Sequence, residues 1–196
     1  MGKERLEAFS DGVLAIILTI MVLELRVPHS ARIADLSPLL PVFVSYVLSF
    51  VNLGIYWNNH HHLLHATRQV DGAVLWANLY LLFWLSLLPF ATGWMGENDF
   101  APTTMAAYGF VLLMAAIAYY LLQREIITQQ GPHSLLARAV GRDWKGKISP
   151  LAYLAAIPLA FVGQWISGAL YIGVALMWLV PDRRISRVLA ERAEDV

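Results

Sequence analysis

An apolar run near the amino terminus, with an acidic residue at each end, constrains this chain more than any other feature. It extends from Gly12 to Leu23 with Thr19 as its one polar side chain, and Asp11 and Glu24 flank it. As a helix, it places the two carboxylates roughly 20 Å apart, whereas the hydrocarbon layer of a bilayer is about 30 Å thick. At least one carboxylate must then lie at membrane depth, where a charge is tolerated only against protein or a water-filled cavity. We expect an inner helix of a membrane protein rather than a lipid-facing anchor.

The composition agrees with a chain that crosses the bilayer several times. Of its 196 residues, 58% are hydrophobic and 14% are charged, which is outside the usual range of soluble domains. Lys3 and Arg5 lead into the first apolar segment without a small-residue cleavage site, so we expect this helix to be retained. The chain has no cysteine, which excludes disulfides, thiolate metal sites and a cysteine nucleophile.

Six apolar segments predict an all-α membrane protein of six transmembrane helices. Turn or charge signals separate them, and they lie near 8–25, 39–64, 73–95, 103–123, 148–165 and 168–181. The last two divide one apolar region that is too long for a single span, and we place the division between Gly163 and Gly168. Residues 1–181 are expected to form one transmembrane domain, and 182–196 a short cytosolic tail.

The distribution of basic residues predicts the orientation. An even number of spans puts both termini on one side, and the outer segments then carry only Arg26 and Arg32. The inner segments carry Lys3, Arg5, Arg68, Arg124, Arg138, Arg142, Lys145, Lys147, Arg183, Arg184, Arg187 and Arg192. The positive-inside rule therefore predicts that both termini are cytoplasmic.

Apolar side chains of the first segment share one helical face. At about 100° per residue, this stripe holds Phe9, Ile16, Ile20 and Leu23, with Thr19 beside it. Asp11 lies about 140° away from Ile16 by the same count, so it points toward neighbouring helices. From spacing alone, such a stripe is most simply a packing face, and a role in lining a path stays open.

The motif Arg5-x-x-x-Phe9-Ser10-Asp11, followed by Ile16-x-x-Thr19, resembles the opening signature of the transmembrane protein 175 family of potassium channels. Later matches to the family are Trp57-x-x-His60-His61, Arg68-x-x-Asp71, Asn78-Leu79 and Leu88-Pro89-Phe90. The resemblance covers roughly residues 5–90. It implies an α-helical channel whose first helices surround the ion path and narrow it with hydrophobic side chains.

Carried over by position, the resemblance assigns the pore residues. Ile16 would form the narrowest constriction, Ile20 and Leu23 further apolar rings, and Thr19 a hydroxyl near them. Nothing similar to the opening signature recurs in the second half of the chain, so a central pore needs several copies around an axis. Single-repeat prokaryotic members of the family form tetramers. The resemblance thus implies a homo-tetramer in the plasma membrane of a prokaryote, with helix 1 lining the pore.

Polar side chains on three segments are expected at one depth. Asp11, His61 and Asn78 each lie about 10 Å from the inner boundary of the membrane. Because buried polar groups need partners in a medium without water, we predict a network that holds the first helix against the second and third. Its members are Arg5, Phe9, Ser10, Asp11, Trp57, His60, His61 and Asn78.

Two other interpretations of the histidines stay open. His61 and His65, four residues apart on a helix, match the spacing of a zinc site, and His60 to His65 match a proton relay. No further metal ligand is visible at helical spacing, so we expect no metal and no cofactor.

The predicted function is passive conduction of potassium, or of monovalent cations generally, through the constriction of helix 1. The chain has no Thr-Val-Gly-Tyr-Gly filter, so selectivity would arise where an ion sheds water at the Ile16 ring. The alternatives are a proton-permeable channel or a proton-coupled secondary transporter; we expect no enzyme. Expected partners are potassium ions, the lipid bilayer and sister subunits, and no nucleic acid.

Overall fold

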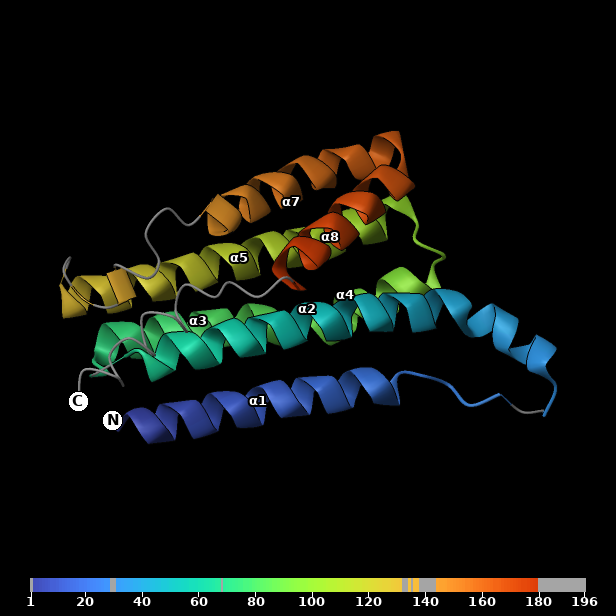
Figure 1. The fold of residues 1–196 in the computed structure, drawn as a ribbon. Helices are drawn as coiled ribbons and strands as arrows, with labels where there is room; N and C mark the ends of the chain where they lie inside the picture. The colour runs from blue at the N-terminus through green and yellow to red at the C-terminus, as the bar shows by residue number, and fades with distance from the viewer. Residues whose placement is uncertain are drawn as a thin grey trace.

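The computed structural model describes residues 2–28, 31–67, 69–131, 134, 136–137 and 144–179, and it contains helices but no strand within these ranges. The elements are α1 (Lys3–Leu23), the 3-10 helix η1 (Ile33–Leu39), α2 (Leu40–His65), α3 (Gly72–Ser86), α4 (Leu88–Glu97), α5 (Pro102–Gln130), α7 (Trp144–Val162) and α8 (Gln164–Leu179). The long helices lie side by side and alternate in direction, with α3 and α4 following one another along the same path (Figure 1). The all-α architecture predicted from the sequence is confirmed.

Four segments are long and apolar enough to cross a bilayer, namely Lys3–Leu23, Ile33–His65, Gly72–Glu97 and Pro102–Gln130. The remaining two helices pack beside them and are shorter. α8 is apolar and has 16 residues, or about 24 Å at 1.5 Å per residue. α7 has 19 residues and contains Pro150 and Pro158. The chain is therefore a membrane protein, and within the described residues each of the six expected segments is mostly helical.

Several helix ends differ from the expected ones because polar residues extend the helices beyond their apolar centres. α1 begins at Lys3 rather than near residue 8, and α5 continues to Gln130 rather than ending near 123. Charged and amide residues at such ends favour a helix but carry no apolar signal. Gly163 alone separates α7 from α8, where the sequence suggested a break over 163–168. The predicted tail 182–196 lies outside the described residues.

The helix expected near 73–95 is interrupted at Leu87. Pro89 has no N–H to donate to the carbonyl four residues earlier, and its ring would clash with that carbonyl. A regular α-helix therefore cannot continue through this point. The Leu87 N–H instead donates to the Trp84 carbonyl at 3.3 Å. At the other end of α3, the Asp71 side chain accepts a hydrogen bond of 2.9 Å from the Val74 N–H, as an N-cap does.

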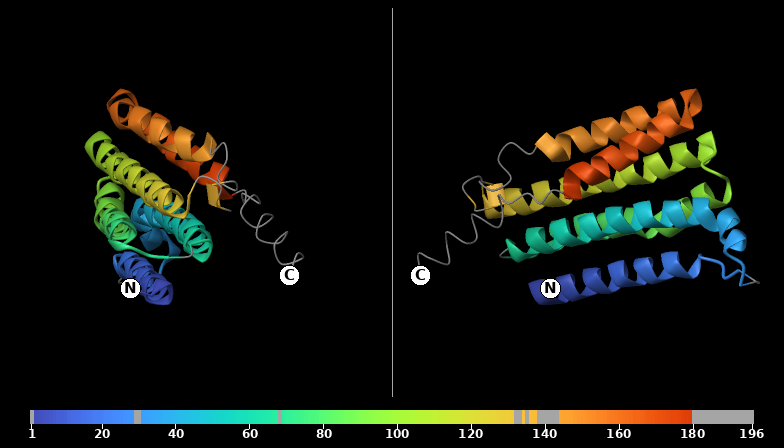
Figure 2. Two further views of the ribbon diagram at one scale, coloured as in Figure 1. Left: turned by 90° about the vertical axis from the view of Figure 1, so that its left-hand side faces the viewer. Right: turned by 45° about the vertical axis from the view of Figure 1, so that its right-hand side comes forward.

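α1 lies at one edge of the protomer. It packs against α2, α3 and α4, whereas α5 lies deeper and also contacts α7 and α8. Figure 2 shows α1 at the periphery in both further views. The inner helix expected from the sequence is thus at the edge of the single chain, and Asp11 is exposed there.

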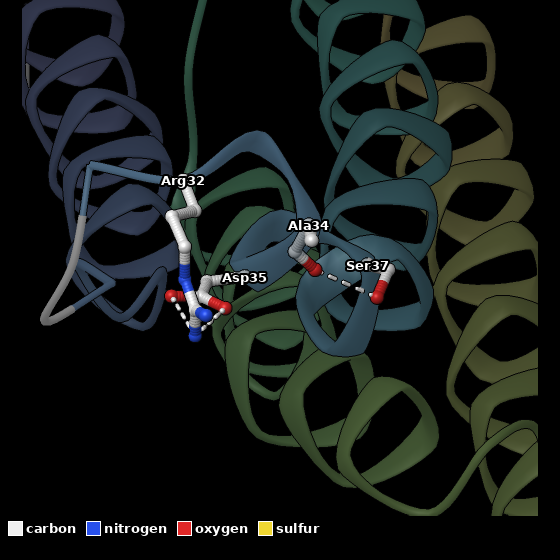
Figure 3. A network of polar contacts seen from close by, with 4 residues as sticks. All are labelled: Arg32, Ala34, Asp35 and Ser37. Atoms are coloured by element: carbon white, nitrogen blue, oxygen red, sulfur yellow. Dashed lines mark hydrogen bonds and ion pairs between the residues drawn. The ribbon is translucent and has the colours of Figure 1, made fainter.

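The segment between α1 and α2 is held by short polar contacts. A guanidinium nitrogen of Arg32 lies 3.1 Å from an Asp35 carboxylate oxygen, and the Ser37 hydroxyl donates to the Ala34 carbonyl at 2.9 Å (Figure 3). Nearer to α1 in the same segment, Arg26 forms a 2.7 Å ion pair with Glu97 at the end of α4. This pair links the chain that follows α1 to the last residue of α4.

Candidate pore-lining face and polar contacts of the first helix

One face of α1 is buried against the neighbouring helices, and the other is exposed. The inward face holds Leu6, Ser10, Leu14, Ile17 and Met21, which are all buried. The residues predicted to line a pore, together with Phe9, lie on the other face. Of these, Ile16 is 60% exposed and Leu23 is 76% exposed, so none of the helices that the structure describes covers them. The predicted stripe therefore points out of the protomer as one continuous apolar surface.

Thr19 does not interrupt this apolar surface with an unsatisfied polar group. Its hydroxyl donates a hydrogen bond of 2.9 Å to the Ala15 carbonyl, one turn earlier in the same helix. A threonine that bonds its own backbone in this way is satisfied without a partner from another element. The stripe thus presents aliphatic and aromatic groups together with one internally bonded hydroxyl.

A buried chain of three side chains fixes the rotation of α1. The Asn78 side-chain nitrogen on α3 donates to the Ser10 hydroxyl on α1 at 3.0 Å. The Asn78 oxygen lies 2.7 Å from Nε2 of His60 on α2, and because an amide oxygen only accepts, this nitrogen carries the proton. All three residues are at most 2% exposed. One amide therefore joins three helices.

A second contact between α1 and α2 lies closer to the surface. The Trp57 ring nitrogen donates to the Asp11 carboxylate at 3.0 Å, and the His61 ring stacks between Trp57 and His65, with centroids 6.2 and 6.1 Å away. The sequence predicted one network, whereas the structure has a buried chain and a separate exposed pair. Within the described residues, neither contact includes Arg5, which is exposed on α1.

Within the described residues, the histidines of α2 are not part of a cluster of metal ligands. In the part of the chain that the structure describes, no three His, Asp or Glu side chains are close enough to hold a metal ion. His61 and His65 are stacked ring on ring, with an interplanar angle of 20°. This arrangement suits aromatic packing along the end of α2.

Charged residues that follow α1 and end α4 line one depression of the surface. A polar depression of about 360 Å³ is lined by Glu24, Arg26, Glu97 and Asp99 together with neighbouring apolar residues. Within this depression, Arg26 pairs with Glu97. Glu24 lies beside Gly93: if Gly93 carried a Cβ, that atom would be 3.3 Å from Oε2 of Glu24. Three carboxylates and one guanidinium leave this end acidic.

Comparison with known proteins adds to these observations. A family model described as "Endosomal/lysosomal potassium channel TMEM175" matches residues 5–89. A protein of Chryseobacterium sp. (strain P1-3) named a potassium channel is 52% identical over 191 residues, which cover 97% of this chain and 100% of that protein. The human protein named "Endosomal/lysosomal proton channel TMEM175" is 35% identical over 103 residues, 46% of this chain and 20% of its own length.

A solved structure shares the whole fold. It is a crystal structure from Chamaesiphon minutus, described as a lysosomal potassium-selective channel TMEM175 homologue. The two chains superpose with a TM-score of 0.79 at 26% sequence identity, over 92% of this chain and 97% of the other. The similarity therefore extends well beyond residues 5–89, which the family model matches.

Proposed function

This chain belongs to the TMEM175 family, and on that premise we propose that it is a potassium channel whose pore is lined by the α1 helices of several copies. The relative from Chryseobacterium, which is similar over nearly the whole chain, is named a potassium channel. The observation that carries the proposal is the apolar stripe of α1, which lies at the edge of the protomer with Ile16 60% exposed. When several copies are arranged around an axis with this stripe facing inward, the stripes face one another along a central path and are shielded from lipid.

Ile16 forms the narrowest ring of this pore, and Ile20 and Leu23 form further apolar rings on its outer side. A cation that passes such a ring sheds part of its hydration shell. Potassium holds its water less tightly than sodium, so its barrier is lower. The same ring gates by dewetting when it narrows. Thr19, bonded to its own backbone, supplies a hydroxyl beside the rings.

The assembly is a homo-tetramer in the plasma membrane of a prokaryote, with both termini cytoplasmic. The sequence supports several copies, because the chain has one opening signature and so supplies one pore helix per copy. Identical subunits around a closed axis are the common way to complete such a pore. The basic residues of its inner segments support the orientation.

A proton-permeable channel is the second candidate. The human relative is named a proton channel, and it matches 46% of this chain. A proton-coupled transporter is the third candidate, but such proteins usually carry paired repeats, and the sequence shows no second copy of the signature. The family consists of ion channels rather than enzymes.

A flux assay with the purified protein in vesicles tests the proposal. Vesicles loaded with potassium are diluted into sodium or into a large organic cation, with and without a pH gradient. A potassium channel dissipates the potassium gradient without a pH gradient, and it passes sodium more slowly. Potassium movement that requires a proton gradient identifies a transporter. No potassium flux above that of protein-free vesicles overturns the proposal.

A further inference from the structure

The chain between α1 and α2 carries the most exposed large apolar side chains of the described residues. Ile33 is 86% exposed and Val27 is 83% exposed, and Leu36 and Leu40 are exposed as well. An apolar pocket of about 360 Å³ lies among them, with Leu25, Leu36 and Leu40 in its wall. We call Leu25, Val27, Ile33, Leu36 and Leu40 the apolar cap. Single exposed apolar residues are ordinary, whereas a contiguous group of them marks an interaction surface.

η1 carries its part of the apolar cap beyond the hydrocarbon layer. If Gly96 near the end of α4 carried a Cβ, that atom would be 2.7 Å from Cα of Val42, so Val42 is level with the charged turn that begins at Glu97. η1 precedes Val42 and adds seven residues, or about 14 Å at roughly 2 Å per residue. The headgroup layer on each side of a bilayer is about 5–8 Å thick. Figure 1 shows η1 extending past the outer ends of the other helices. Water therefore surrounds this part of the cap in a single copy.

This position determines what drives a contact of the cap. Helices inside a bilayer have no hydrophobic driving force toward one another, because lipid tails are as apolar as leucine. In water, by contrast, the burial of apolar surface is favourable. The side chains of Ile16, Ile20 and Leu23 face the ion path of the proposed pore, so they are not closed against one another when it conducts. A contact between caps supplies an association energy that these rings do not.

A neighbouring copy is the occupant that the position of the cap favours. Figures 1 and 2 show η1 and the chain that follows α1 on the side of the bundle where α1 lies. The exposed stripe of α1 ends at Leu23, and Val27 follows four residues later, so the cap continues from the face that the proposed pore turns toward its axis. The Arg32 guanidinium pairs with Asp35 at 3.1 Å (Figure 3), so this segment brings no net charge that would repel an identical copy.

The shape of the cap suits a ring of identical copies. The interfaces of such a ring are heterologous, so each copy needs two different surfaces that fit one another. The side chains of Val27 and Ile33 project from the cap. The apolar pocket lies between the chain that follows α1 and the start of α2. One copy thus offers both a projecting apolar group and a pocket that can receive it.

We propose that the apolar caps of neighbouring copies dock on one another, with Ile33 of one copy in the apolar pocket of the next. This inference rests on the proposed function, because it takes the ring of copies around the pore as given. The contact holds the subunits together on the outer side of the membrane, while the Ile16 ring lines the ion path. Lipid headgroups are polar and offer no apolar surface that would cover Ile33 at this height.

Cysteine cross-linking tests the contact, because the chain has no cysteine of its own. One tagged copy carries Ile33→Cys, and a copy with a different tag carries Leu36→Cys at the pocket. Membranes that contain both copies are treated with a mild oxidant. We expect a product of two chains that carries both tags. In the control, Val162→Cys replaces Ile33→Cys and should give no such product, because Val162 is 77% exposed at the end of α7, on the side of the bundle away from α1 (Figure 2).

Dissociation of the assembly measures the strength of the contact. Ile33→Asn should not change the unfolding of the protomer, because this side chain is exposed in the single copy. In the assembly it places an amide in the apolar pocket, so the dissociation constant of the copies in detergent should rise about ten-fold or more. Loss of energy transfer between separately labelled copies on dilution measures this constant. Val162→Asn, the matched control, should keep the wild-type constant, and potassium flux per assembled channel should be that of the wild type in both variants.

Two results would overturn the docking of the caps and leave the pore intact, provided that the protein still assembles and conducts potassium. One is a yield of doubly tagged product no higher than in the Val162→Cys control, as expected if lipid or another protein covers the cap. The other is a wild-type dissociation constant for Ile33→Asn. A wild-type protein that stays monomeric and passes no potassium overturns the proposed function together with the docking.

Discussion

The side-chain nitrogen of Asn78 on α3 donates a 3.0 Å hydrogen bond to the hydroxyl of Ser10 on α1. This bond is buried, and Ser10 lies about 120° around α1 from Ile16. Turning α1 by about 100° would move Ser10 out of reach, and in one of the two directions it would carry Ile16 onto the buried face. The polar contact therefore determines which side chains α1 presents to the outside of the protomer.

Replacing Asn78 should destabilise the protein without touching the exposed stripe. Asn78→Leu removes the partner of both Ser10 and His60, and a buried polar group left without a partner costs about 1–3 kcal/mol. We expect a lower melting temperature in detergent and a smaller yield of the assembled oligomer. Asn58→Leu, at an exposed position on α2 two residues before His60, is the control and should leave both nearly unchanged. Equal melting temperatures for Asn78→Leu and the wild type would contradict the structural role.

Periodicity and depth predicted much of this arrangement. The 100° count separated the stripe of Ile16 and Leu23 from the buried face of α1, and both residues are exposed. Counting depth along three helices placed Asp11, His61 and Asn78 at one level, and Ser10 is the neighbour of Asp11 that bonds Asn78. Depth alone, however, does not choose between His60 and His61, because both lie at nearly the same level and differ by about 100° around α2. Packing against α3 decides that His60 is the buried partner.

Contacts between distant residues escaped sequence reasoning. Arg26 and Glu97 are 71 positions apart, and no local spacing rule joins them. The buried hydrogen bonds from Thr92 to Ser49 and from Ser49 to Tyr108 likewise depend on how α4 and α5 lie against α2. The polar residues of α2 were visible at regular spacing, which was the signal that could have indicated them.

Gly109 is expected to tolerate no side chain. The Tyr171 hydroxyl passes over it to donate to the Met105 carbonyl at 2.8 Å, and a Cβ on Gly109 would collide with that hydroxyl. Gly109→Ala should therefore lower stability by about 1–3 kcal/mol, as overpacking does. Gly173→Ala on α8 meets nothing within 4 Å and should instead raise stability by up to about 1 kcal/mol through helix propensity.

Thermal unfolding in detergent measures both glycine variants. Adding Tyr171→Phe to Gly109→Ala removes the colliding oxygen and should recover part of the lost stability, because residues in contact are not additive. If the double variant loses more stability than the two single variants lose together, the collision is not the cause.

Ile16→Asn tests the constriction. An amide at the narrowest ring hydrates the passing ion, and a barrier lower by about 1.4 kcal/mol raises the current about ten-fold. We expect larger currents in bilayer recordings and a weaker preference for potassium over sodium. Ile172→Asn, the same change on an exposed face of α8, should keep wild-type currents and selectivity. Wild-type currents in Ile16→Asn would place the constriction at another residue.

Arg26→Gln should raise potassium current at low salt by removing the one guanidinium from the acidic depression at the outer end of α1. The Arg26 and Glu97 side chains are 79% and 49% exposed, so loss of their ion pair should cost less than about 1 kcal/mol of stability. The electrostatic effect should be clear at 0.01 M salt, where the screening length is about 30 Å, and absent at 1 M, where it is about 3 Å. Glu97→Gln makes the opposite charge change and should lower the current over the same range of salt. Single-channel recordings of inward current at several salt concentrations measure both variants, and an increase that persists at 1 M salt would point to a steric rather than an electrostatic cause.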